Sequence, residues 1–188
     1  MKRIVILASG SGTLAQSIFE ADFSEEGGEV VALICDKPNA AVLDKAQMRN
    51  VENYTIPMIA DRNLWNSELE DLLAALRPTL VVSAGFMRIL PGPITTRFKI
   101  INSHPALLPL FPGAHAVRDA LAAGVKETGT TIHWVDAGVD TGEVIVQEKV
   151  EIFEGDSEES LHERIKIIER GLIVATIRRL LPTLEPHQ

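Results

Sequence analysis

The sequence predicts an α/β domain with a mostly parallel sheet and helices on both faces. Continuous apolar runs rich in Val and Ile recur along the chain, and such runs are typical of strands that are buried on both faces of a sheet. Segments with the apolar spacing of helices separate most of these runs, which indicates an alternating α/β order. At 188 residues, the chain has the length of one domain with a substantial core.

The individual elements follow from these patterns in chain order. Apolar runs, from RIVILA at the start to EVIVQEKV near the end, predict strands at residues 3–8, 30–35, 80–85, 99–102, 130–135 and 143–150. Helical spacing predicts helices at residues 14–21, 40–49, 62–76 and 114–123, and a long final helix after Ser157. Ser157 and the acidic residues behind it are typical of a helix start, and apolar residues then recur at intervals of three and four.

Composition and charge exclude several classes of protein. Hydrophobic residues make up 46% and charged residues 23% of the chain, which is ordinary globular composition. The net charge of −8 argues against a nucleic-acid partner, because phosphate binding relies on clustered Lys and Arg. Cys35 is the single cysteine, which fits a reducing compartment. The start MKRIVILASG lacks the pattern of a signal peptide, and no run approaches the roughly 18 apolar residues of a membrane span. We therefore expect a cytoplasmic protein without a membrane partner.

A glycine-rich loop joins the first strand to the first helix. In ILASGSGTLAQSI, the residues Gly10, Gly12 and Ala15 fit the G-x-G-x-x-G/A pattern, and Asp36 stands where a dinucleotide site needs an acidic residue. A simple phosphate would also suit the free N–H groups of the first helical turn. A tight turn without any ligand is the third interpretation. The loop alone does not choose among these three.

A polar pair stands at the end of a buried strand in KIINSHPALLPLFPG. If the strand continues to His104, Asn102 and His104 point to the same side, at the edge where open α/β sheets place their sites. An amide beside an imidazole suits the stabilisation of a developing oxyanion. Three prolines at 105, 109 and 112 would hold the following loop in one shape. The alternative is a proline-rich apolar turn with an incidental histidine.

A second loop, in WVDAGVDTGEVI, offers carboxylates. Asp136 and Asp140 flank glycines, and such a loop can carry a carboxylate into a cleft. An aspartate near His104 would favour the charged imidazolium. Aspartate next to glycine is also ordinary turn chemistry, so both interpretations stay open at this point.

Taken together, these motifs resemble the glycinamide ribonucleotide formyltransferases, folate-dependent enzymes of purine synthesis. The matching segments are LASGSGT, SAGFMRIL, INSHPALLPLFPG, HAVRDALAAGVKETGTTIHWVDAGVDTGEVI and GDSEESLHERIKIIE. They span nearly the whole chain, and N-x-H-P-[SA]-L-L-P followed by a D-x-G loop is specific to formyltransferases that use 10-formyltetrahydrofolate. The resemblance implies one Rossmann-like formyltransferase domain over residues 1–188. Its N-terminal half would bind the ribonucleotide phosphate, and its C-terminal half would bind folate and carry the catalytic residues.

The resemblance also implies roles for particular residues. Asn102, His104 and Asp140 would form the catalytic set, with Asn102 and protonated His104 stabilising the oxyanion and Asp140 keeping His104 protonated. The residues implied for the ribonucleotide are Gly12, Thr13, Leu14, Lys166 and Glu169. The residues implied for folate are Arg62, Met87, Arg88, Ile89, Leu90, Asn102, Ala137, Gly138, Val139, Asp140 and Thr141. Without the resemblance, Lys166 and Glu169 would be interpreted as a solvated helix face. The co-substrate would be 10-formyltetrahydrofolate, no metal is expected, and a homodimer is implied by the family alone.

The chain departs from the common pattern of this family at three positions. Many members carry Asn where Leu14 stands, so the backbone alone would have to hold the phosphate. Ser103 replaces a usual apolar residue, and Leu110 stands where a basic residue is frequent. None of these departures touches the three implied catalytic positions.

Three other functions are weighed against this one. A formyltetrahydrofolate hydrolase shares the fold and catalytic residues, but it is usually preceded by a small regulatory domain and tends to have a second histidine where Pro105 stands. A methionyl-tRNA formyltransferase would need a further tRNA-binding domain and a basic surface. A non-catalytic nucleotide-binding module would use the glycine loop and leave His104 without a role.

Overall fold

A single mixed sheet organises the computed structural model, which describes residues 1–186. Its seven strands lie in the order β3-β2-β1-β4-β5-β6-β7. The bounds are β1 Lys2–Ala8, β2 Gly28–Cys35, β3 Glu52–Thr55, β4 Leu80–Ser83, β5 Ile100–His104, β6 Glu127–Trp134 and β7 Val144–Glu151. Strands β1 to β5 pair in parallel, whereas β6 pairs antiparallel with both β5 and β7. The predicted mostly parallel α/β sheet is confirmed, with an antiparallel extension at one end.

Helices follow the strands much as the sequence predicts. Their bounds are α1 Thr13–Glu20, α2 Ala41–Met48, α3 Arg62–Leu76, α4 Gly92–Arg97, α5 Ala116–Ala122 and α6 Glu158–Leu180. Ser157 caps α6 as predicted: its hydroxyl accepts from the Ser160 N–H, and the Ser160 hydroxyl accepts from the Ser157 N–H. Among the described residues, no helix combines the length and the apolarity needed to cross a membrane.

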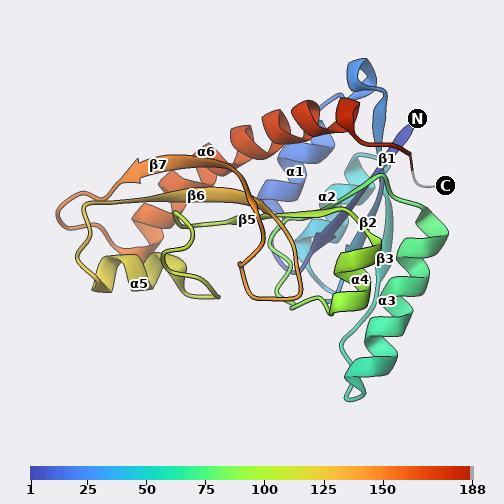
Figure 1. Cartoon of the computed structure of the whole chain (residues 1–188), viewed down its shortest axis with the longest axis horizontal. Coiled ribbons are helices and arrows are strands. Elements are labelled where there is room, and N and C mark those ends of the chain that lie inside the picture. The colour runs from blue at the N-terminus through green and yellow to red at the C-terminus, as the bar shows by residue number, and fades with distance from the viewer. Residues whose placement is uncertain (187–188) are drawn as a thin grey trace.

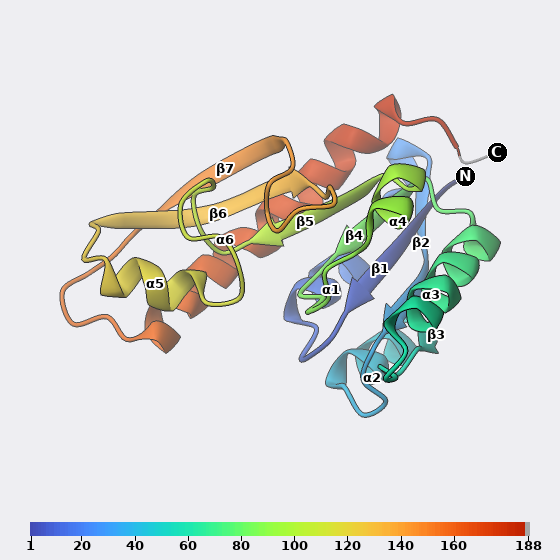
Figure 2. The same ribbon diagram turned by 60° about the horizontal axis from the view of Figure 1, so that its bottom comes forward.

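The helices cover both faces of the sheet. Helices α1, α2 and α6 pack on one face, and α3 and α4 pack on the other, with α6 running alongside α1 (Figure 1). Alternate side chains of β1 divide accordingly, because Ile4 and Ile6 belong to the α1/α6 side while Val5 and Leu7 belong to the α3/α4 side. Figure 2 shows β6 and β7 extending beyond the parallel strands toward α5.

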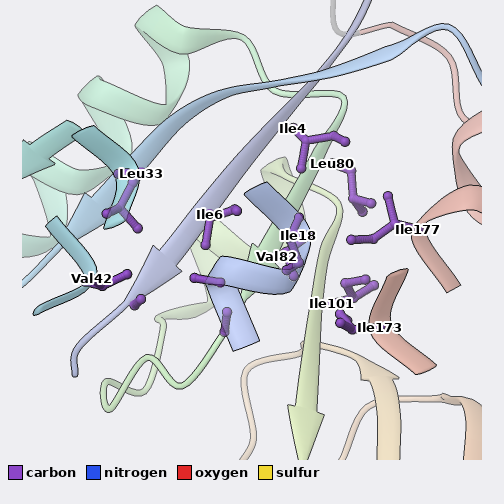
Figure 3. Close-up of a cluster of buried hydrophobic side chains, with 14 of the residues drawn as sticks. Ile4, Ile6, Ile18, Leu33, Val42, Leu80, Val82, Ile101, Ile173 and Ile177 are labelled. Atoms are coloured by element: carbon purple, nitrogen blue, oxygen red, sulfur yellow. The ribbon is translucent and has the colours of Figure 1, made fainter. Parts of the chain in front are cut away.

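The core on the α1/α6 side fixes the helices that later form one wall of the site. Ile18 of α1 lies beside Val82, Ile173 of α6 lies beside Ile101 of β5, and Ile177 of α6 lies beside Leu80 of β4 (Figure 3). All of these side chains are fully buried. Ile100, the neighbour of Ile101, belongs instead to the core on the α3/α4 side. Successive residues of β5 therefore face opposite sides of the sheet.

The structure corrects several details of the sequence-based prediction. Strand β3 and helix α4 were not expected, because β3 is an edge strand with mostly exposed side chains and α4 has only six residues. Strand β4 ends at Ser83 rather than at 85, since Gly85 has a left-handed φ of 75° and turns the chain. Strand β5 continues to His104, beyond the expected end at 102.

Candidate active site

A cavity of about 640 Å³ lies at the carboxyl ends of the central parallel strands. Its lining comes from residues 10–14 after β1, 83–90 after β4, 102–105 at the end of β5, and the loop after β6. Helix α6 adds His162, Lys166 and Glu169. Open α/β sheets place their ligands at this edge. The structure thus brings most of the sequence-predicted site residues, from distant parts of the chain, into one cavity.

His104 lies between two oxygen atoms that can only accept hydrogen bonds from it. Its Nδ1 is 3.3 Å from Oδ2 of Asp140, and its Nε2 is 2.8 Å from the backbone carbonyl oxygen of Phe111. The side chain of His104 is only 5% exposed, so water does not replace either contact. The imidazole of His104 is thus hydrogen-bonded to a backbone carbonyl on one side and lies 3.3 Å from the Asp140 carboxylate on the other.

The proline-rich loop after β5 closes over this pair. Phe111 supplies the carbonyl that accepts from His104, and the Gly113 N–H donates to Oδ2 of Asp140 at 2.8 Å. Phe111 and Asp140 both have left-handed backbones, with φ of 53° and 54°. Such conformations are costly for residues other than glycine and persist only where the surroundings hold them. The loop thus contributes two backbone groups that fix the imidazole and the carboxylate.

The Asp140 carboxyl is held in its ionised form. Burial raises its pKa, but contacts with His133, the Gly113 N–H and His104 outweigh burial and hold the pKa below its ordinary value. Asp140 is accordingly a carboxylate across the physiological pH range.

His133 is a site residue that the sequence analysis missed. It lies on β6 directly opposite Asn102 of β5, and it is 2% exposed. Its Nδ1 faces the backbone carbonyl of Trp134 at 2.9 Å, while its Nε2 lies 3.2 Å from Nδ2 of Asn102 and 3.6 Å from Oδ1 of Asp140. The neutral ring can accept from the amide, and the charged ring can donate to the carboxylate. The only signal in the sequence is a histidine inside an apolar strand, and nothing there indicates its cross-strand partner.

The glycine loop forms the opposite wall of the cavity. Gly12 caps α1 with a left-handed φ of 69°, and no side chain caps the first turn. A Cβ at Gly12 would overlap the Val42 side chain, so any other residue at this position would be strained. Gly12, Thr13 and Leu14 all line the cavity, where the first-turn N–H groups are available to an anion.

Lys166 and Glu169 reach the cavity from α6. Lys166 donates from Nζ to Oε1 of Glu163 at 2.7 Å, on the same helix. Glu169 is 7% exposed, and its Oε1 accepts from Ser103 at 2.7 Å and from Thr130 at 3.4 Å. A solvated helix face, the alternative considered for this pair, is incompatible with the burial of Glu169.

The segment 87–90 lines the cavity on the α3/α4 side. Met87 and Ile89 are 65% and 61% exposed, whereas Leu90 is buried. Arg62 donates from Nη2 to the backbone carbonyl of Ile89 at 2.6 Å. Arg62 itself lines a neighbouring depression rather than the main cavity, and it shares that depression with Arg88 and other residues of this segment.

The glycine-containing loop after β6 supplies the rest of this side. Gly138, Val139 and Asp140 line the main cavity, while Ala137 lines the neighbouring depression. Thr141 lines neither; its hydroxyl donates to Oδ1 of Asp136 at 2.7 Å, which stabilises the loop.

Asp36 does not have the setting of a dinucleotide site. Its side chain is fully buried, and its Oδ2 is 2.5 Å from Nε of Arg88. A carboxylate in that position is not available to a ribose hydroxyl in the cavity. The structure therefore argues against a dinucleotide site at the glycine loop.

Within residues 1–186, no group of three or more His, Cys, Asp or Glu side chains is placed to hold a metal ion.

Comparison with known proteins gives consistent matches. A family model described as "Formyl transferase" matches residues 2–177. A phosphoribosylglycinamide formyltransferase of Mycobacterium tuberculosis (strain ATCC 25618 / H37Rv) is 47% identical over 183 residues, which cover 95% of this chain and 84% of that protein. The phosphoribosylglycinamide formyltransferase of Escherichia coli (strain K12) is 36% identical over 174 residues, which cover 90% of this chain and 82% of that protein. The crystal structure of glycinamide ribonucleotide transformylase 1 from Symbiobacterium toebii superposes with a TM-score of 0.91 at 36% identity, covering 100% of this chain and 95% of that one.

Proposed function

The chain belongs to the formyl transferase family, and from this premise we propose that it moves the formyl group of 10-formyltetrahydrofolate to the amine of glycinamide ribonucleotide. This is a step of purine biosynthesis. The observation that carries the proposal is the contact of His104 with Asp140, at 3.3 Å, in the same cavity as Asn102 and the glycine loop. Relatives that cover most of this chain carry the same activity in their names.

The reaction needs a stabilised oxyanion and a route for one proton. The substrate amine attacks the formyl carbon, a C–N bond forms, and the carbonyl electron pair moves to oxygen. Asn102 has a second hydrogen on Nδ2 beyond the one near His133, and this hydrogen and the charge of His104 stabilise the oxyanion. The bond from the formyl carbon to folate nitrogen then breaks. The proton lost by the attacking amine passes by way of Asp140 and water to the departing nitrogen.

The two substrates occupy opposite walls of the cavity in this proposal. The phosphate of the ribonucleotide binds the first-turn N–H groups at Gly12, Thr13 and Leu14, and Lys166 supplies a positive charge. The pterin of folate lies against residues 87–90 and 137–141, and the exposed Met87 and Ile89 side chains offer an apolar surface for it. Arg62 lies outside the main cavity, where a carboxylate tail of folate would emerge.

The test is the release of tetrahydrofolate from 10-formyltetrahydrofolate, measured with and without glycinamide ribonucleotide. We expect release only when both substrates are present. Release without the ribonucleotide would identify a hydrolase, and no release together with tight NAD binding would identify a nucleotide-binding module. The buried setting of Asp36 argues against that last outcome.

Two further expectations from the sequence stay predictions. These are the cytoplasmic location and the homodimer. Sedimentation of the purified chain would decide the oligomeric state.

A further inference from the structure

We propose that Ser103 is a positioning residue for the ribonucleotide, because its hydroxyl holds the Glu169 carboxylate in place for that substrate. The inference rests on the proposed formyl transfer and adds a residue to it. Ser103 lies between Asn102 and His104, but it belongs to a different wall of the cavity.

The alternation of β5 separates these neighbours. Ile100 packs on the α3/α4 side and Ile101 packs on the α1/α6 side, so Ser103 follows Ile101 toward α6. There its Oγ donates to Oε1 of Glu169 at 2.7 Å. Asn102 and Ser103 are consecutive on β5, yet in this proposal Asn102 faces the formyl carbonyl of the substrate while Ser103 contacts Glu169 on α6.

The two carboxylate oxygens of Glu169 differ in their hydrogen bonds. Its Oε1 is shared by the hydroxyls of Ser103 at 2.7 Å and Thr130 at 3.4 Å. Its Oε2 accepts no hydrogen bond from any residue between 1 and 186, although Glu169 lines the cavity. A carboxylate only accepts, so a ligand that completes Oε2 must bring a donor, such as a hydroxyl group of the ribonucleotide.

Ser103 decides which way the carboxylate faces. A buried carboxylate requires hydrogen-bond donors, and Ser103 provides the shorter of the two bonds. An apolar residue at this position would leave Oε1 with only the 3.4 Å contact from Thr130. The carboxylate would then be free to rotate, and Oε2 would lose its fixed orientation toward the cavity.

The first experiment measures the steady-state constants of Ser103→Ala for both substrates. We expect the KM for glycinamide ribonucleotide to rise about tenfold, the scale for losing a hydrogen bond to a charged group. The kcat and the KM for 10-formyltetrahydrofolate should stay within about twofold, since Ser103 faces away from the formyl side. Ser103→Thr keeps the hydroxyl and should restore the wild-type KM. Thr95→Ala removes a hydroxyl on α4 that bonds to Gly92, outside the cavity, and should change none of these values.

A double-variant cycle separates positioning from a general structural role. In a Glu169→Gln background, Ser103→Ala should add little further loss of ribonucleotide affinity, measured by calorimetric titration of the folded variants. Equal losses in both backgrounds would overturn the proposal, and so would an unchanged KM or a loss confined to kcat. Failure of the formyl-transfer proposal would be seen separately, as wild-type protein that releases no tetrahydrofolate in response to the ribonucleotide.

Discussion

Asn102 and His133 face each other across the antiparallel pair β5 and β6, with Nδ2 of Asn102 lying 3.2 Å from Nε2 of His133. The same imidazole nitrogen lies 3.6 Å from Oδ1 of Asp140. His133 therefore connects the amide and the carboxylate on either side of it. Because its other ring nitrogen faces the Trp134 carbonyl, the ring has one fixed orientation.

This arrangement predicts how the Asp140 carboxyl titrates. Its pKa should lie below the ordinary value of 3.8, since contacts with His133, Gly113 and His104 outweigh the effect of burial. In His133→Leu, the apolar volume stays but the ring nitrogen that lies next to the Asp140 carboxylate is lost, so the pKa of Asp140 should rise. Carboxyl ¹³C NMR of the two proteins measures both values. An identical titration in the variant would contradict this role and leave His133 as a partner of Asn102 alone.

The geometry of the glycine loop predicts that alanine at Gly12 and alanine at Gly10 have different effects on the free energy of unfolding. At Gly12, φ is 69° and a Cβ would overlap Val42. Gly12→Ala should therefore lower the free energy of unfolding by about 2 kcal/mol or more, combining a left-handed backbone with overpacking. Urea denaturation measures this change.

Gly10→Ala is the matched control for Gly12→Ala. A Cβ at Gly10 meets nothing within 4 Å. The control should change the free energy of unfolding by less than about 0.5 kcal/mol. Equal destabilisation of both variants would contradict the geometry of the loop. The same reasoning means that weaker ligand binding in a Gly12 variant would not by itself identify a phosphate contact.

We expect Lys166 to make a salt-dependent contribution to ribonucleotide binding. As a point charge at the cavity, it should make affinity fall as ionic strength rises, because mobile ions screen the attraction. Lys166→Met should weaken binding and flatten that dependence. Lys149→Met removes the same charge from a surface pair with Glu127 and serves as the control. A Lys166→Met protein with wild-type affinity and wild-type salt dependence would exclude Lys166 from the site.

Much of the fold could be predicted from the sequence, and the failures have physical reasons. The buried strands and the 15-residue helix α3 were predicted because continuous apolar runs and helical spacing encode burial. Strand β3, with the sequence ENYT, carries no such signal because its side chains lie at an exposed sheet edge. Helix α4 follows Pro91 and is too short to show a period.

The sequence could predict the site only where its residues are close together along the chain. Asn102 and His104 share a strand, so their common direction follows from the alternation of side chains. From the residues alone, a pairing of His104 with Asp140 could not be distinguished from an ordinary turn at Asp140, since aspartate beside glycine is common in turns. His133 and the bond from Ser103 to Glu169 depend on strand order and helix packing, which connect residues 31 and 66 positions apart.

The most direct test of the account is the kinetic effect of removing His104. Because the oxyanion exists only in the transition state, His104→Ala should lower kcat for formyl transfer by roughly 10²- to 10³-fold, and Asn102→Ala should do the same. The dissociation constants of both substrates, measured on the same proteins, should change by only a few fold. A His104→Ala enzyme that keeps its kcat, or that loses only substrate affinity, would contradict the central role given to the β5 residues.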